Sequence, residues 1–496
     1  MIRILKDQDL QGKDILMREP IRGGVEETVS GILSDVKQNK DKALFAYCEK
    51  FDGVKLEKLE VTQKEIEKAC GSMEPRFWEI LNTAKKNIEA FHRKQVKNSF
   101  VLTEKSGVVM GQKVIPLDRV GIYVPGGTAA YPSSVLMNCL PAKIAGVKEV
   151  VMVTPPGNSG INPAILAAAK VAGVDRVFQV GGAQAVAALA YGTESIPRVD
   201  KITGPGNAYV AEAKKQVFGQ VAIDMIAGPS EILIIADASC NPRYVAADLL
   251  SQAEHDANAC AVLITDSEKL AKDVKKELET QWHPLPRREI ARASIQANGK
   301  IILTDSIERA IELSNRLAPE HLELCVDNPF DYLDAIRHAG SLFLGKYCPE
   351  ALGDYLAGPN HTLPTSGTAR FSSPLSVDDF VKKSSFIYYT ADALDKIGDH
   401  VIDFAKKEGL DGHARAIDAK RHARFATHDP LGLVLGREVR VLEVLGLVEH
   451  HRPLRLEHLV GDLQGIPPEL FADLLADLDA VDGIELNVIV GDEFLH

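Results

Sequence analysis

Four residues that lie far apart in the chain have side chains suited to binding one divalent metal ion. Gln252 and His255 lie three positions apart in DLLSQAEHD, whose apolar spacing predicts a helix, so both project from one face. Asp354 and His413 follow much later, so only a folded chain, or two chains together, can join them. Two imidazole nitrogens and two oxygens, without a thiolate, suit Zn²⁺ or Mn²⁺ with positions left open for a substrate. A helical histidine beside a glutamine is usually a solvated or capped surface residue, so the spacing alone favours that interpretation over a metal site.

A second candidate group is the pair Glu320-His321 in APEHLEL, at the boundary between a predicted helix and a predicted strand. An imidazole can take a substrate proton near neutral pH, and an adjacent carboxylate can activate water. Glu-His pairs also occur at 254–255 and 449–450, so the pair by itself does not identify a site. His361 lies in PNHTLP, a loop held by prolines, where it is a candidate for holding a substrate.

Three glycine turns follow predicted strands and precede predicted helices. They are YVPGG at 123–127, VGGAQA at 180–185 and GPGNAYVAEA at 204–213, and the chain contains no GxGxxG fingerprint. Glycines at strand ends let backbone amides approach a phosphate or a nucleotide closely. A single such turn is common wherever a strand leads into a helix, but three in consecutive units favour a ligand crevice at the carboxyl ends of the strands.

The order of the predicted elements indicates an α/β protein. Two Rossmann-like parallel-sheet units without the GxGxxG fingerprint are expected near 120–236 and 237–375, with helical N-terminal and C-terminal segments around them. The segments LSVDDFVKK and DALDKIGDHVIDFAKKEG are both predicted as helices. The expected divisions are an N-terminal arm at 1–26, a larger α/β domain formed by 27–123 with 237–375, a second α/β domain at 124–236, a helical C-terminal domain at 376–420 and an appended tail at 421–496.

Composition excludes several classes of protein. The 496 residues are 45% hydrophobic and 25% charged, as in ordinary globular proteins, and the net charge of −12 disfavours nucleic acid as a partner. No apolar run predicts a membrane span, and the charged N-terminus predicts no export signal. Seven scattered cysteines without a CxxC pair predict reduced thiols and a cytoplasmic protein.

The last 76 residues differ in composition from the rest of the chain. They contain no lysine, with 14 acidic residues against 6 arginines. PPELFADLLADLDA predicts a helix and GIELNVIV a strand, whereas His450, His451 and His458 have no metal-binding spacing. A fused module, an oligomerisation arm and a sequence from a shifted reading frame all remain open.

Several long segments closely resemble the histidinol dehydrogenase family. They stand in the family's order and spacing and cover about residues 3–420: VGIYVPGGTAAYPSSVLMN, VGGAQAVAALAYGTESIPRVDKITGPGNAYVAEAK, AIDMIAGPSEILIIAD, DLLSQAEHDANA, APEHLEL, ALGDYLAGPNHTLPT and EGLDGHARA. The resemblance implies one Zn²⁺ bound by Gln252, His255, Asp354 and His413. In the family the last of these ligands comes from the partner subunit of an intertwined homodimer, so the active sites are shared.

The resemblance also implies roles for the remaining candidates. Glu320 and His321 match the family's acid/base pair. The positions that match substrate contacts, besides the metal ligands and His321, are Ser230, His361 and Glu408. The positions that match NAD contacts are Tyr123, Gln184 and Asn207, one in each glycine turn, which makes 124–236 the NAD-side domain.

The activity implied is the NAD-dependent oxidation of L-histidinol to L-histidine through bound L-histidinal, with two hydride transfers, at the end of histidine biosynthesis. Two other functions stay open. A metal-dependent hydrolase would use the same ligands with Glu320 as base, but would leave the glycine turns without a purpose. A non-catalytic ligand-binding homologue is disfavoured by the complete set of candidate residues.

Overall fold

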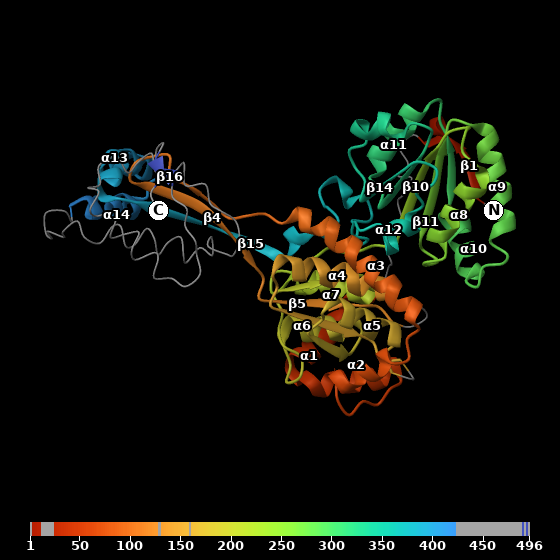
Figure 1. Cartoon of the computed structure of the whole chain (residues 1–496), viewed down its shortest axis with the longest axis horizontal. Coiled ribbons are helices and arrows are strands. Elements are labelled where there is room, and N and C mark those ends of the chain that lie inside the picture. Colours follow the sequence, from red (N-terminus) through yellow and green to blue (C-terminus); the bar gives the residue numbers. More distant parts are fainter. Residues whose placement is uncertain are drawn as a thin grey trace. The chain divides into compact units, whose positions relative to one another are not determined.

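The computed structural model describes residues 2–10, 24–126, 130–157, 160–422, 489–490 and 493–494 (Figure 1). The chain divides into two compact units, Met1–Tyr388 and Tyr389–His496. The first unit contains two six-stranded sheets with helices around them, so the predicted α/β class is confirmed. No helix in the described ranges is both long and apolar enough to span a membrane.

The first sheet has the strand order β2-β7-β6-β5-β8-β9. Its strands are parallel except for β2, which pairs antiparallel with β7. The order reverses between β5 and β8, and open α/β sheets bind ligands at such a reversal, beyond the carboxyl ends of the strands. The strands are β2 (Glu60–Val61), β5 (Arg119–Tyr123), β6 (Glu149–Thr154), β7 (Arg176–Gln179), β8 (Lys201–Thr203) and β9 (Ala222–Ile223), and the connecting helices are α4 (Pro132–Ala145), α5 (Pro163–Ala172), α6 (Gly182–Tyr191) and α7 (Ala208–Val217).

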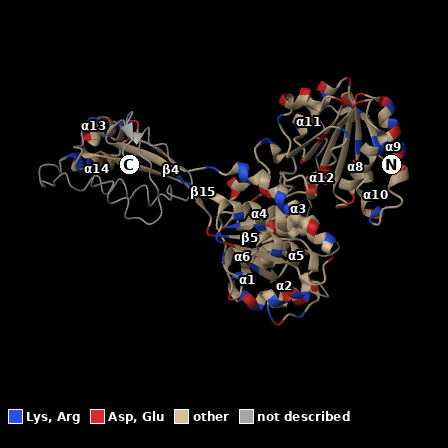
Figure 2. Cartoon of the chain, in the orientation of Figure 1, with Lys and Arg blue, Asp and Glu red and all other residues tan. Residues whose placement is uncertain are grey.

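The second sheet, mostly green in Figure 1 with β1 in red, is parallel throughout, with the order β1-β12-β11-β10-β13-β14. Every residue of β10 and β11 is buried, as expected for strands covered by helices on both faces. Charged residues gather on the outer helices, and the central strands are mostly uncharged (Figure 2). The elements are β1 (Arg3–Lys6), β10 (Glu231–Ala236), β11 (Cys260–Thr265), β12 (Lys300–Leu303), β13 (His321–Cys325), β14 (Ser341–Leu344), α8 (Pro242–Ala253), α9 (Glu268–Gln281), α10 (Arg288–Ala297), α11 (Ile307–Leu317) and α12 (Glu350–Tyr355).

The N-terminal helices pack on the first sheet, which differs from the predicted grouping of 27–123 with 237–375. These helices are α1 (Val25–Tyr47), α2 (Gln63–Cys70) and α3 (Pro75–His92). The buried face of α1 joins the core around β6 and α6, and α3 joins the core around α4 and α5. The arm at 1–26 instead supplies β1, which pairs with β12 of the second sheet. Apolar periodicity shows that a helix has a buried face, but it does not show which sheet covers that face.

A three-stranded sheet of order β15-β4-β3 corrects another expectation. LSVDDFVKK was predicted as helix, but it forms only a single 3₁₀ turn, η6 (Val377–Phe380), and then enters β15 (Val381–Tyr389). Ser376 and Asp379 form a capping box, a helix-start signal, but VKKSSFIYY behind it is rich in residues that favour strands. The other strands are β3 (Phe100–Leu102) and β4 (Val108–Pro116), and the remaining short turns are η1 (Asp7–Leu10), η2 (Cys48–Asp52), η3 (Arg93–Gln95), η4 (Pro329–Ala335) and η5 (Thr368–Arg370).

The second unit contains two described helices, α13 (Ala391–Lys407) and α14 (Asp411–His422). The helix predicted for DALDKIGDHVIDFAKKEG is therefore confirmed by α13. Within the tail, β16 (Ile489–Val490) pairs antiparallel with β17 (Glu493–Phe494), and the first of these ends the predicted strand GIELNVIV. The helix predicted for PPELFADLLADLDA lies outside the described residues.

Candidate active site and metal centre

The amino edge of the second sheet brings the predicted acid/base pair together with other candidates. His321 is the first residue of β13 and pairs in register with Ile232 of β10. Glu320 precedes β13, and Ser230 directly precedes β10, so both lie at the same edge. The parallel register therefore gathers residues that are about 90 positions apart in the sequence.

The His321 ring is buried and held in one tautomer. Its Nδ1 lies 2.8 Å from the backbone carbonyl oxygen of Glu231. Because a carbonyl can only accept, Nδ1 must carry the proton and donate it, which leaves Nε2 as an unprotonated acceptor. Nε2 is buried and has no hydrogen-bond partner within the described part of the chain. Burial lowers the pKa of His321, against the opposing charge of Asp354, so the neutral ring is favoured.

Two carboxylates lie on opposite sides of this ring. Glu320 Oε2 is 3.7 Å from His321 Nδ1 and accepts a 2.7 Å hydrogen bond from the Glu231 backbone N–H. Glu350 Oε1 is 4.0 Å from His321 Nε2. The unprotonated nitrogen therefore faces the region of Glu350, and Glu320 lies on the side of the ring that is already hydrogen-bonded.

A possible metal centre lies beside His321. Ligand atoms of His255, Glu350 and Asp354 all lie within 4.8 Å of one another. Gln252 is fully buried at the end of α8, and its amide faces the Glu350 carboxylate, with contacts of 2.7 and 2.8 Å when the amide nitrogen is turned toward it. One imidazole, two carboxylates and an amide match the nitrogen and oxygen donors that Zn²⁺ or Mn²⁺ takes, so the donor set fits such a metal.

Glu350 was not among the residues predicted for the site. It is the first residue of α12, four positions before Asp354, so both side chains lie on one face of that helix. Burial raises the pKa of Glu350 well above its usual range, and the nearby charge of Asp354 adds to this effect. The helical spacing of the two acids in PEALGDY is the signal that would have found Glu350 from the sequence.

His361 connects Asp354, a candidate metal ligand, to the first sheet. Its Nδ1 lies 3.1 Å from the backbone oxygen of Asp354 and 3.9 Å from its carboxylate. Its Nε2 lies 3.4 Å from the hydroxyl of Ser134, near the start of α4. Burial lowers the pKa of His361, which favours a neutral ring. His361 is therefore placed to present a neutral imidazole beside the metal ligands.

Two further predicted site residues belong to the second compact unit. Glu408 is the C-cap of α13, and His413 lies in the first turn of α14. Their participation in the cluster of His255, His321, Glu350 and Asp354, hereafter the histidine–carboxylate cluster, stays a prediction.

The predicted NAD contacts lie at the carboxyl edge of the first sheet, around the reversal of strand order. Tyr123 ends β5, and its hydroxyl accepts a 3.0 Å hydrogen bond from the N–H of Gly182. Gln184 is buried in the first turn of α6. Asn207 caps α7, its side-chain oxygen accepting from two backbone N–H groups at 3.0 and 3.1 Å. The capping bonds leave its amide nitrogen as the group that can donate to a ligand.

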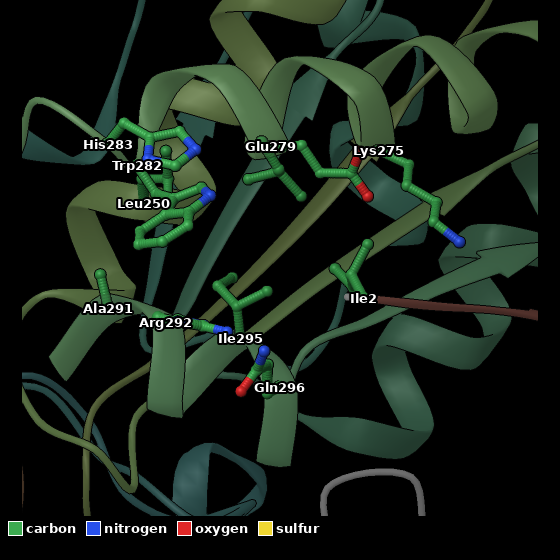
Figure 3. A pocket seen from close by; sticks show the side chains of 11 residues that line it. Ile2, Leu250, Lys275, Glu279, Trp282, His283, Ala291, Arg292, Ile295 and Gln296 are labelled. Atoms are coloured by element: carbon green, nitrogen blue, oxygen red, sulfur yellow. The ribbon is translucent and has the colours of Figure 1, made fainter. Parts of the chain in front are cut away.

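A separate cavity of about 240 Å³ lies among α8, α9 and α10 of the second sheet (Figure 3). Trp282 contributes an aromatic wall, with His283 stacked on it at 4.1 Å between ring centroids. None of the predicted site residues lines this cavity. It is therefore distinct from the candidate active site.

Two six-stranded sheets with reversals of strand order, a glycine-rich carboxyl edge and a buried histidine–carboxylate cluster define an α/β protein with Rossmann-like sheets. The family model described as histidinol dehydrogenase matches residues 18–421. The chain is 59% identical to histidinol dehydrogenase of Bacillus cereus over 396 residues, covering 80% of this chain and 92% of that protein. It is 56% identical to the enzyme of Clostridium acetobutylicum over 426 residues, covering 85% and 99%.

A solved structure agrees with these sequence matches. The crystal structure of histidinol dehydrogenase from Elizabethkingia anophelis superposes with a TM-score of 0.81 at 40% identity, covering 86% of this chain and 99% of that one. The chain belongs to the histidinol dehydrogenase family.

Proposed function

We propose that this protein oxidises L-histidinol to L-histidine through bound L-histidinal, with NAD⁺ as hydride acceptor in both steps. The observation that carries the proposal is the unprotonated Nε2 of His321, buried beside the clustered donor atoms of His255, Glu350 and Asp354. A base held beside metal-binding groups suits alcohol oxidation, because the base can take the hydroxyl proton and a bound metal can orient the substrate.

The proposed Zn²⁺ ligands are Gln252, His255, Asp354 and, from a partner subunit, His413. Support for the first three is their shared position at the amino edge of the second sheet. A bound Zn²⁺ supplies a Lewis acid that holds and orients the substrate's polar groups. Glu350 lies among these ligands and orients the Gln252 amide, so it belongs to the same centre.

The chain's own residues account for the proton transfers. His321 Nε2 takes the hydroxyl proton of L-histidinol as a hydride leaves the same carbon, which yields the aldehyde. Glu320 removes a proton from a water that adds to the aldehyde, while His321 returns its proton to the aldehyde oxygen, which gives a gem-diol and leaves His321 Nε2 unprotonated again. His321 then takes a hydroxyl proton of the gem-diol as the second hydride leaves, which yields the carboxylic acid. Holding the aldehyde in a closed site prevents the loss of a reactive compound.

The remaining candidates position the two organic molecules. Ser230, His361 and Glu408 are proposed to contact the substrate. Tyr123, Gln184 and Asn207 are proposed to contact NAD, which makes the segment around 124–236 the nucleotide side. A cytoplasmic homodimer in which α14 completes the partner's site is part of the same proposal.

The test is a direct assay of the purified protein. NADH absorbance is followed with L-histidinol and NAD⁺, and L-histidine is quantified in the same samples. We expect two NADH for each L-histidine formed, loss of activity after chelator dialysis, and recovery on adding Zn²⁺. Absence of NADH formation from the metal-loaded protein would contradict the proposal, and hydrolytic turnover without NAD⁺ would favour the hydrolase alternative.

A further inference from the structure

The glycine turn that follows β8 lies in close contact with the end of β5. A Cβ atom placed on Gly204 would lie 2.1 Å from the backbone oxygen of Tyr123, and the φ angle of Gly204 is +112°. Only glycine can occupy this position without displacing the strand. The turn therefore lies at a fixed distance from Tyr123, and it leads directly to Asn207, the cap of α7.

A buried ion pair holds both polar groups of the same glycine. Lys214 and Asp224 form an ion pair whose side chains are 2% and 1% exposed. Lys214 Nζ donates a 3.0 Å hydrogen bond to the Gly204 carbonyl, and the Gly204 N–H donates a 2.7 Å hydrogen bond to Asp224 Oδ2. The other oxygen of Asp224 accepts from the Met225 N–H at 2.6 Å. The N–H and the carbonyl of Gly204, which belong to two successive peptides, are thus clamped by opposite charges.

The stability of α7 does not explain why the Lys214–Asp224 clamp on Gly204 is present. The helix already has its own cap and buries Val210, Ala213 and Val217 in the core. Removing two charges from water is costly, and an apolar pair of similar volume is often equally stable. Orientation is a better explanation, because a charged pair with directed hydrogen bonds permits a single arrangement of the turn.

The turn is also placed where a nucleotide would need it. Pro205 has no N–H, so Gly206 and Asn207 supply the main-chain donors that follow Gly204. These groups lie at the strand-order reversal, where doubly wound sheets bind nucleotides.

We infer that Lys214 and Asp224 are positioning residues, which hold the turn 204–207 and the Asn207 amide in the conformation that binds the nucleotide. The inference rests on the proposed use of NAD. Both residues act through the turn and belong to neither the histidine–carboxylate cluster nor the predicted NAD contacts.

The decisive variant is Lys214→Met/Asp224→Asn, which removes both charges and keeps an oxygen that can accept from Gly204. We expect its KM for NAD⁺ and its calorimetric Kd for NAD⁺ to rise by about tenfold or more, since a loosened turn must be ordered on binding. The KM for L-histidinol and the zinc content should stay within about twofold of wild type, because the metal centre keeps its contacts. Lys215→Met is the matched control, since the neighbouring Lys215 side chain is 52% exposed.

Each outcome decides the inference. A folded double variant with unchanged KM and Kd for NAD⁺ would overturn it, even if the melting temperature fell, because the pair would then be structural only. If the double variant does not fold, Asp224→Asn alone is judged by the same two constants. Wild-type protein that forms no NADH from L-histidinol contradicts the proposed function instead, whereas active wild-type protein with unaffected variants contradicts only the role of the clamp.

Discussion

At the residue scale, the hydrogen bond from His321 to the Glu231 carbonyl determines what the site can do. It places the proton on Nδ1 and leaves Nε2 to act as a base. The same ring in the opposite tautomer would present a proton where a lone pair is needed. One backbone oxygen on the neighbouring strand therefore controls whether the imidazole can accept a substrate proton.

The first prediction concerns the pH dependence of the reaction. Because burial lowers the pKa of His321, the ring stays unprotonated below the ordinary value of 6.5, and activity is lost only as pH falls through the lowered pKa. We expect the acid limb of kcat/KM against pH to lie below 6.5. His321→Asn should lower kcat by about 10²- to 10⁴-fold in both oxidation steps and remove that limb. If His321→Asn retained the acid limb of the kcat/KM profile, another group would be the base.

The second prediction separates the roles of the acid/base pair. Glu320→Gln should slow oxidation of L-histidinal much more than that of L-histidinol, because only the aldehyde step consumes water. Single-turnover rates measured from each starting compound make the comparison. Equal losses in the two halves would show that Glu320 only positions His321, to which its carboxylate lies 3.7 Å away.

The third prediction concerns Glu350. Glu350→Gln should weaken zinc binding by about 10- to 100-fold, since it alters a group that contacts both the Gln252 amide and the metal-ligand cluster. Zinc retained after graded chelator dialysis gives the measurement. Glu268→Gln is the control, because the Glu268 side chain is 69% exposed. Full zinc retention by Glu350→Gln would place Glu350 outside the metal centre.

At the element scale, function depends on which ends of the strands face a ligand. The first sheet offers its carboxyl edge, with the turns that follow β5, β7 and β8. The second sheet offers its amino edge, where β10 and β13 begin. His361 lies 3.4 Å from Ser134, so a loop of the second sheet touches a helix of the first. The two proposed half-sites, for nucleotide and for substrate, thus share a contact within one compact unit.

The fourth prediction tests the turn after β8. Gly204→Ala should destabilise the fold by at least about 2 kcal/mol more than Gly219→Ala, because overpacking adds to backbone strain. Both glycines have positive φ angles, +112° and +100°, but an added Cβ at Gly219 meets no atom within 4 Å. Urea unfolding gives the two free energies of unfolding. Equal losses would show that the contact with Tyr123 adjusts without cost.

At the scale of the whole molecule, the predicted ligand set is distributed over both compact units. Gln252, His255 and Asp354 belong to the first unit, and His413 belongs to the second. A site completed by a second chain would make activity depend on assembly. The family model also ends at residue 421, so the 75 residues beyond it are not part of the matched region.

The fifth prediction tests sharing between subunits. Asp354→Asn and His413→Asn should each be inactive alone, and unfolding and refolding the two together should restore about a quarter of wild-type activity. Half of the mixed dimers are hybrids, and one of the two sites in each hybrid keeps both ligands. Mixing without any recovery would mean that each site is formed within one chain.

Several features of the fold and site could be predicted because they depend on neighbours in the sequence. The glycine turns at strand ends are such local patterns, whereas the helix predicted for DLLSQAEHD ends at Ala253, so His255 lies just beyond it. The helix α13 also followed from periodicity alone. Family resemblance added the roles, since spacing by itself favoured a solvated surface histidine over a metal ligand.

The sequence alone thus determined the α/β class, the local elements and the types of side chain available for chemistry, because these follow from periodicity and turn chemistry within short segments. Only the tertiary structure decided that α1 and α3 cover the first sheet, that VKKSSFIYY is a strand, that Glu350 lies with His255 and Asp354, and that Glu231 sets the tautomer of His321. The physical reason is that strand register and helix packing bring together residues that are about 90 positions apart, as in β10 and β13, or more than 200 apart, as in Ser134 and His361, and such long-range contacts leave no mark on the local pattern.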